Sequence, residues 1–145
     1  MNGPGQAAEV DPTRLFVALG RVNRAVRRDG TPGEVGHGAL SVLATLVADG
    51  PQRAGALAAT EGVSPPSLTR IVAALEDLGH VRRVPDPDDG RACIVEVTES
   101  GRDLVQAGRA AKMAALAERI AALAPDARAS LAAALPALEQ LSQDD

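Results

Sequence analysis

Aromatic side chains are almost absent from the sequence. Among 145 residues Phe16 is the single phenylalanine, and there is no tryptophan or tyrosine. Proteins that read unpaired bases stack them on aromatic rings, so this composition argues against a single-strand or RNA-binding module. It also means that any ligand pocket has to be lined by aliphatic side chains.

Cysteine and histidine are scarce as well. The one cysteine, Cys93, excludes an internal disulfide and a metal site built from several cysteines. His37 and His80 lie far apart and have no cluster of cysteine or acidic residues beside them, so we expect no metal ion and no other cofactor. Cys93 falls on the apolar face of an expected strand, where we predict a small buried residue rather than a redox sensor.

Long hydrophobic runs and leader-like segments are missing. No stretch approaches the run of about 18 apolar residues that a membrane-spanning helix needs. Residues 1–12 are polar and rich in glycine and proline, unlike a signal peptide. We therefore expect a soluble cytoplasmic protein with no membrane partner. The chain length predicts one domain, and a hydrophobic content of 46% is enough for a core.

Catalytic patterns are also absent. No nucleophile lies beside a base motif, and no glycine-rich loop suited to phosphate occurs. The only carboxylates that stand out are the aspartates of the turn at 85–91, which have another explanation below. We do not expect an enzyme.

Positive charge is in short supply for a nucleic-acid binder. The net charge is −4, whereas such proteins are usually basic. Of the 15 basic residues only Lys112 is a lysine. Arginine suits duplex DNA better than lysine, because its planar guanidinium can form two hydrogen bonds with a phosphate or with the edge of a guanine. Any binding of duplex DNA therefore has to depend on arginines placed locally.

The stretch 63–101 organises the chain. Ser64 is a good N-cap, and Pro65 at the first helical position predicts a helix that Gly79 ends. Strands are expected at 81–84 and 92–97, with a charged turn between them. Gly62 joins the helix to a shorter one at 54–60, as in a helix-turn-helix. We predict a mainly α fold with a small β-hairpin wing, that is, a winged helix-turn-helix.

One face of the expected helix at 65–78 suits the major groove. The apolar side is needed for the core, and the opposite side presents Pro66, Arg70, Ala73 and Asp77, flanked by Ser67 and Thr69. Arg70 can reach O6 and N7 of a guanine, and Pro66 and Ala73 can contact thymine methyl groups. Ser67, Thr69 and the free amides at the helix start suit phosphate oxygens.

The turn at 85–91 carries the expected wing tip. We predict that Asp89 pairs with the guanidinium of Arg91 and directs it into a narrow minor groove. The alternative is an ordinary solvated hairpin turn. The nearby Arg53, Arg82 and Arg83 are candidates for phosphate contacts.

The two ends of the chain look like a dimerisation platform. The first helix (11–29) and the last two (99–142) are more apolar than one small winged-helix core requires, so we expect them to pack together and against a second copy. Pro136 should kink the last helix or end it at Leu135. Residues 1–10 are expected to form a disordered arm, and 11–142 a single domain with a DNA-binding lobe at about 36–98.

These residues resemble the MarR-type winged-helix transcriptional regulators. Asp89-x-Arg91 and Val97-Thr98-x-x-Gly101 are similar to that family's wing signature, and the helix beginning at Ser64 is similar to its recognition helix. The resemblance covers about 13–141. It departs where Gly90 replaces the first of two adjacent wing arginines, and where Arg53 occupies the usual cap position of the preceding helix.

The resemblance implies a homodimer, a near-palindromic operator and, usually, repression. It implies Arg91 in the minor groove with Asp89 as its partner, and base and backbone contacts from Ser64, Pro66, Ser67, Thr69 and Arg70. Many such regulators respond to a small molecule. Here that would be an apolar or anionic ligand, with Arg21 or Arg24 as the partner of an anion. The alternatives for these two arginines are a solvated helix face or a secondary phosphate contact.

The sequence thus predicts a sequence-specific regulator that binds double-stranded DNA, a repressor relieved by a small-molecule ligand. The alternative is a winged-helix dimer that serves protein interactions without specific DNA binding. The net charge favours the alternative, whereas Arg70 and Arg91 disfavour it.

Overall fold

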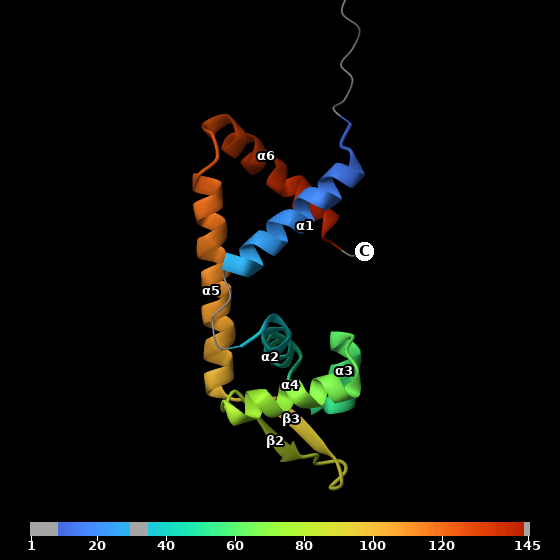
Figure 1. The fold of residues 1–145 in the computed structure, drawn as a ribbon. Helices are drawn as coiled ribbons and strands as arrows, with labels where there is room; N and C mark the ends of the chain where they lie inside the picture. Colours follow the sequence, from blue (N-terminus) through green and yellow to red (C-terminus); the bar gives the residue numbers. More distant parts are fainter. Residues whose placement is uncertain (1–8, 30–34, 144–145) are drawn as a thin grey trace, which may run out of the picture.

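The computed structural model describes residues 9–29 and 35–143. A long helix, α5, runs along a lower lobe and an upper pair of helices (Figure 1). In chain order the elements are α1 (Pro12–Asp29), α2 (His37–Asp49), β1 (Gln52–Arg53), α3 (Ala54–Glu61), α4 (Pro65–Asp77), β2 (Val81–Pro85), β3 (Cys93–Val97), α5 (Glu99–Ala121) and α6 (Pro125–Leu141). The predicted helices and hairpin are confirmed, with ends that shift by a few residues. Of the expected arm at 1–10, residues 1–8 lie outside the described part.

The sheet has three strands rather than the predicted two. Its order is β1-β3-β2, and both pairings are antiparallel. β1 pairs Gln52 with Val95 and Arg53 with Ile94. The sequence could not reveal a strand of two residues, because it is too short for any alternation of polar and apolar side chains. Its presence makes β3 the central strand and ties the wing to the segment before α3.

The hydrophobic core lies in the lower lobe. Its fully buried side chains come from α2, α3, α4 and β3: Val42, Leu43, Leu46, Leu57, Leu68, Val72, Leu75 and Val95. Leu104 and Val105 of α5 pack against this cluster from the side. The lobe therefore has a core of its own, which holds α4 and the wing in a fixed relation.

A tight junction joins the end of α4 to the start of α5. The Thr98 hydroxyl donates to the Gly79 carbonyl at 2.6 Å and accepts from the Gly101 amide at 3.2 Å. The Thr98 amide also donates to the His80 carbonyl at 3.0 Å. A Cβ on Gly101 would lie 2.2 Å from that His80 oxygen, so only glycine allows this approach. Thr98 and Gly101, which carried part of the family resemblance, are therefore structural residues.

The upper helices bury little of their apolar surface. α1 is tied to α5 by the buried Val26 and by an ion pair of 2.6 Å between Asp29 and Arg119, whose hydrogen bond lowers the pKa of Asp29. None of the described residues of α6 is buried. Leu135 and Leu141 of α6 and Phe16 of α1 are exposed.

Of the two outcomes expected at Pro136, a kink or an end of the helix at Leu135, the end is wrong. Pro136 lies inside α6, which continues to Leu141. Proline has no N–H, so the helix lacks one hydrogen bond at that point but continues through it. Across the described residues, no helix combines the length and apolarity required to cross a membrane.

Candidate nucleic-acid interface

The start of α4 is capped as predicted. The Ser64 hydroxyl accepts from the Ser67 amide at 3.4 Å and donates to the Ser67 hydroxyl at 2.9 Å. Gly62, in the turn before it, has a φ of 65°, the left-handed conformation that lets α3 and α4 meet at a short turn. The Thr69 hydroxyl donates to the Pro65 carbonyl at 2.9 Å, so its proton is already used within the helix. Thr69 would have to rotate to donate to a phosphate.

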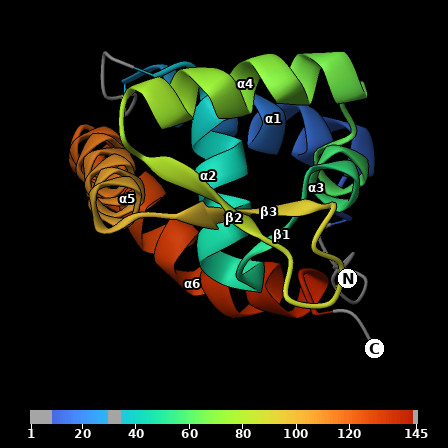
Figure 2. The ribbon, with the colours of Figure 1, turned by 90° about the horizontal axis from the view of Figure 1, so that it is seen from below.

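The face of α4 that the sequence assigned to DNA is open to solvent. The exposed members are Ser64, Pro66, Ser67, Thr69 and Arg70, and Ala73 is half-buried. The Arg70 side chain makes no hydrogen bond or ion pair with any described residue. Seen from below, α4 lies along one side of the sheet, and the turn between β2 and β3 projects on the other (Figure 2). The lobe therefore presents a helix and a loop as two separate projections.

The predicted pairing of Asp89 with the Arg91 guanidinium does not occur. Asp89 instead accepts from the Arg91 backbone amide at 3.1 Å, and its carbonyl accepts from the Ala92 amide at 2.9 Å. An aspartate side chain readily reaches the amide two residues later and closes a local turn. The carboxylate thus shapes the loop that carries Arg91, and among the described residues no carboxylate binds that guanidinium.

A different aspartate anchors the wing to the helix-turn-helix. Asp86 is 7% exposed, and Arg53 donates to it from Nε at 2.6 Å. Asp86 also accepts from the Asp88 amide at 2.9 Å. The Asp88 amide and then Arg53 lower the pKa of this carboxyl, and the carboxylate in turn raises the pKa of Arg53. This pair could not be predicted from the sequence, because 33 residues separate its members.

All three arginines predicted to contact phosphates are paired inside the lobe. Arg53 binds Asp86 at 2.6 Å, Arg82 binds Glu96 at 2.8 Å, and Arg83 binds Glu76 at 3.1 Å. Residues 36–98 contain five arginines and eight acidic residues. In this range, the arginines without a described partner are Arg70 on α4 and Arg91 at the wing.

Acid should loosen the wing through Asp86. Its folded-state pKa is lowered, so the ion pair stabilises the fold fully above the unfolded value of about 3.9 and is lost as pH falls through the folded pKa. We expect the melting temperature of the native protein to fall more between pH 6 and pH 3 than that of Asp86→Asn. Asp86→Asn removes this one carboxylate and keeps the others, and identical pH profiles would contradict the role given to Asp86.

Cys93 is not the buried residue that the sequence predicted. It is exposed and pairs with Pro85 at the end of the hairpin, whereas Val95 and Val97 on the same face are buried. The alternation of the strand was interpreted correctly, but the core ends before Cys93. No group of three or more histidine, cysteine or acidic side chains is placed to hold a metal ion in the described ranges.

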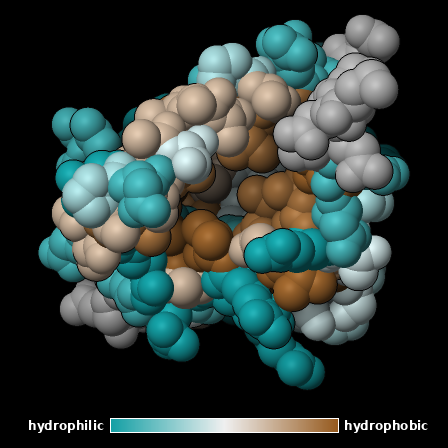
Figure 3. Space-filling model, turned by 90° about the horizontal axis from the view of Figure 1, so that it is seen from above, coloured by the Kyte–Doolittle hydropathy of each residue, from teal (hydrophilic) through white to brown (hydrophobic). Residues whose placement is uncertain are grey.

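A second surface lies between the upper helices. Figure 3 shows a hollow lined by hydrophobic side chains on the upper face. The hollow between α1, α5 and α6 has a volume of about 920 Å³, and its apolar lining includes Leu19, Val22, Ile120 and Leu135. Arg21, Arg119 and Arg128 also line it. Arg119 is paired with Asp29, and Arg128 donates to the Ala121 and Leu123 carbonyls.

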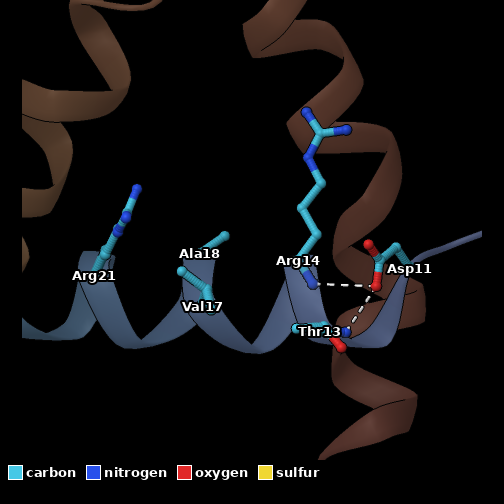
Figure 4. A pocket seen from close by; sticks show the side chains of 6 residues that line it. All are labelled: Asp11, Thr13, Arg14, Val17, Ala18 and Arg21. Atoms are coloured by element: carbon cyan, nitrogen blue, oxygen red, sulfur yellow. Dashed lines mark hydrogen bonds between the residues drawn. The ribbon is translucent and has the colours of Figure 1, made fainter.

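A shallower hollow on α1 shares one arginine with the larger one. It holds about 460 Å³ and is lined by Asp11, Thr13, Arg14, Val17, Ala18 and Arg21. Asp11 caps the helix through the Thr13 and Arg14 amides, and Arg14 and Arg21 rise from the same side (Figure 4). Of the two arginines proposed as anion partners, Arg21 lines both hollows and Arg24 lines neither.

Comparison with known proteins places the chain among transcriptional regulators. The MarR family model matches residues 37–93. An HTH-type transcriptional regulator of Mycobacterium tuberculosis is 45% identical over 98 residues, which cover 68% of this chain and 68% of the relative. A transcriptional regulator from Pseudomonas aeruginosa aligns with a TM-score of 0.74 and 28% identity over 92% of this chain and 94% of its own. MepR of Staphylococcus aureus, solved as a mutant bound to an oligodeoxyribonucleotide, shares the fold, with a TM-score of 0.68, 19% identity and coverage of 93% and 100%.

Proposed function

The chain belongs to the MarR family of winged helix-turn-helix transcriptional regulators, and from this premise we propose that it is a homodimeric repressor of a near-palindromic operator. Members of the family are DNA-binding regulators and not enzymes. We further propose that it acts in the cytoplasm, that 36–98 form the lobe that binds DNA, and that 11–29 and 99–142 form the dimer platform.

The observation that carries the proposal is the pair of unpartnered arginines at the two projections of the lobe. Every other arginine of 36–98 has a carboxylate within 3.1 Å, whereas Arg70 and Arg91 have none among the described residues. A bidentate arginine is the commonest specific contact to guanine in the major groove, and a narrow minor groove attracts an inserted arginine. Ser64, Pro66, Ser67 and Ala73 would surround the first contact.

The dimer is supported by the exposed apolar surface of the upper helices. α6 has no buried residue although it carries four leucines, and a helix of this length is marginal in water without packing. A second copy related by a two-fold axis would cover this surface. It would also present two α4 helices to half-sites about one duplex turn apart.

Relief by a small molecule is the finer part of the proposal. The hollow between α1, α5 and α6 combines an apolar lining with three arginines, which suits an apolar or anionic compound wherever the partner copy leaves it open. Titration of the DNA complex with a series of aliphatic and aromatic carboxylates tests this part. Release by one of them would support relief, and a complex unaffected by all of them would count against it.

The decisive experiment is selection of duplex sequences by the purified protein, followed by a salt titration of the selected site. Enrichment of a two-fold-symmetric sequence would support the proposal. No enrichment would favour the alternative function, a winged-helix dimer that binds other proteins. The salt titration measures how many phosphate contacts the complex makes.

If Arg70 forms hydrogen bonds with a guanine, Arg70→Ala should weaken binding to the selected operator by about 1–3 kcal/mol. It should also relax the base preference at one position of each half-site. Binding of the parent and the variant to operators changed at single positions measures both effects. Arg109→Ala on α5, an exposed arginine outside the lobe, is the charge-matched control. An unchanged base preference would assign Arg70 to the phosphate backbone instead.

A further inference from the structure

We propose that Arg53 and Asp86 are positioning residues that hold the wing at a fixed place relative to α4. The inference rests on the proposed DNA binding and gives Arg53 a role different from a phosphate contact. The pair joins the two parts of the lobe that would read a duplex. It would therefore set the separation between Arg70 and Arg91.

The first argument is where the two residues lie. Arg53 is the last residue of β1 and the N-cap of α3, so its backbone belongs to the helix-turn-helix. Asp86 directly follows β2, at the point where the chain leaves the sheet for the wing turn. The Nε–Oδ2 bond of 2.6 Å therefore connects the start of the helix-turn-helix to the base of the wing.

The second argument is how fully Asp86 is engaged. One carboxylate oxygen accepts from Arg53, and the other accepts from the Asp88 amide at 2.9 Å. Its own amide donates to the Ala92 carbonyl at 2.9 Å, across the turn. It is also the one charged residue that is buried in the described part of the chain. A buried carboxylate that loses its cation is left uncompensated, so the structure around it would rearrange.

The third argument is that, apart from the core and the Arg83–Glu76 ion pair, β1 is the main connection between the wing and the helix-turn-helix at this edge. β1 contributes only two residues to the sheet, which is a weak connection for a hairpin that projects into solvent. Arg91 precedes Ala92, whose carbonyl Asp86 holds. The position of Asp86 therefore fixes the base of the loop from which Arg91 extends. The bond to Asp86 holds the Arg53 guanidinium against the wing and uses its Nε donor.

Arg53→Met tests the inference, because it removes the charge and the donors but keeps a side chain of similar length. Without DNA, we expect the amides of Asp88 and Ala92 to exchange with solvent about tenfold faster, while the amides of α4 keep their rates. Arg109→Met on α5 provides a matched loss of charge and should leave wing exchange unchanged. Unchanged wing exchange in Arg53→Met would overturn the proposal.

A double-mutant cycle with Arg91 separates positioning from direct contact. If Arg53 acts through the placement of Arg91, Arg53→Met should weaken operator binding about tenfold in the native background and less than about threefold in Arg91→Ala. A direct phosphate contact would give equal losses in both backgrounds and lower the salt slope by about one, and would overturn the proposal.

The hydrogen-exchange measurement tests the positioning role of Arg53 and Asp86 independently of the proposed DNA binding, because it needs no DNA. If the native protein selects no duplex, the proposed function fails, and the exchange rates alone decide whether Arg53 and Asp86 hold the wing.

Discussion

Gly101→Ala is expected to destabilise the folded protein by about 2 kcal/mol or more, although alanine is the better helix former. In an open helical position the change gains about 1 kcal/mol. Here the new Cβ would lie 2.2 Å from the His80 carbonyl oxygen and 2.7 Å from a methyl group of Val97. The first of these neighbours is backbone, so the end of α4 and the start of α5 would have to move apart. Overpacking of this kind costs roughly 3 kcal/mol at a site that cannot yield.

Thermal or denaturant unfolding measures this effect, with Gly55→Ala as the control. Gly55 is also helical, but a Cβ there meets nothing within 4 Å. We expect Gly55→Ala to be neutral or stabilising and Gly101→Ala to lower the melting temperature by several degrees. Equal melting temperatures for the two variants would mean that the junction at His80 can relax, and the account of Gly101 would be wrong.

The junction at Gly101 explains why a sequence signature near the wing need not contact DNA. Thr98 bonds to Gly79 and His80 in the segment between α4 and β2, Gly101 packs against His80, and Thr98 caps α5 at the same time. A single threonine and a close-packed glycine thus connect the proposed reading helix to the proposed dimer platform. A change in the direction of α5 would be transmitted to α4 through backbone contacts.

Local features of the fold were predictable from the sequence because their causes lie within a few residues. The cap at Ser64, the left-handed Gly62 and the cap at Thr98 each depend on bonds between neighbours three or four positions apart. The periodicity of the apolar residues then placed the core side of α4. These signals were sufficient for the class of fold and for the face of α4 that is open to solvent.

The ion pairs of the lobe could not be predicted, because each one depends on how distant segments meet. Arg53 and Asp86 come together only because β1 joins the sheet, and β1 has no signal of its own. The three aspartates of the wing turn could not be told apart by residue type. The structure shows that Asp86 binds an arginine side chain whereas Asp89 binds a backbone amide. Cys93 was misplaced for a related reason, since alternation gives the face of a strand but not the edge of the core.

These ion pairs also affect how a lobe rich in acidic residues binds DNA, which is itself negatively charged. Arg82 and Arg83 are bound by Glu96 and Glu76, so they add little positive potential beyond the pair itself. Phosphate contacts supply most sequence-independent affinity. A lobe whose flanking arginines are already neutralised should bind random duplex weakly and depend on the contacts of Arg70 and Arg91. Specificity would then come partly from the absence of general attraction.

The other large effect is expected from Leu135→Asp, which should convert the proposed dimer into monomers and abolish operator binding. Leu135 is half-exposed and lines the hollow between α1, α5 and α6. If a second copy covers that surface, Leu135→Asp removes an apolar contact and places a carboxylate where it must lose its hydration. The loss at such a position should raise the dimer dissociation constant by at least about thirtyfold.

Sedimentation equilibrium over a range of protein concentrations measures the change, with Ala133→Asp as the control. Ala133 is exposed on α6 and does not line the hollow, so the same charge is added to the same helix on another face. We expect Ala133→Asp to remain dimeric and to bind the operator, while Leu135→Asp is a folded monomer with an intact lobe core. A Leu135→Asp protein that stays dimeric would mean that another surface joins the two copies. Because the lobe has its own buried core, the loss of DNA binding in a folded monomer would show that both reading helices must be held together.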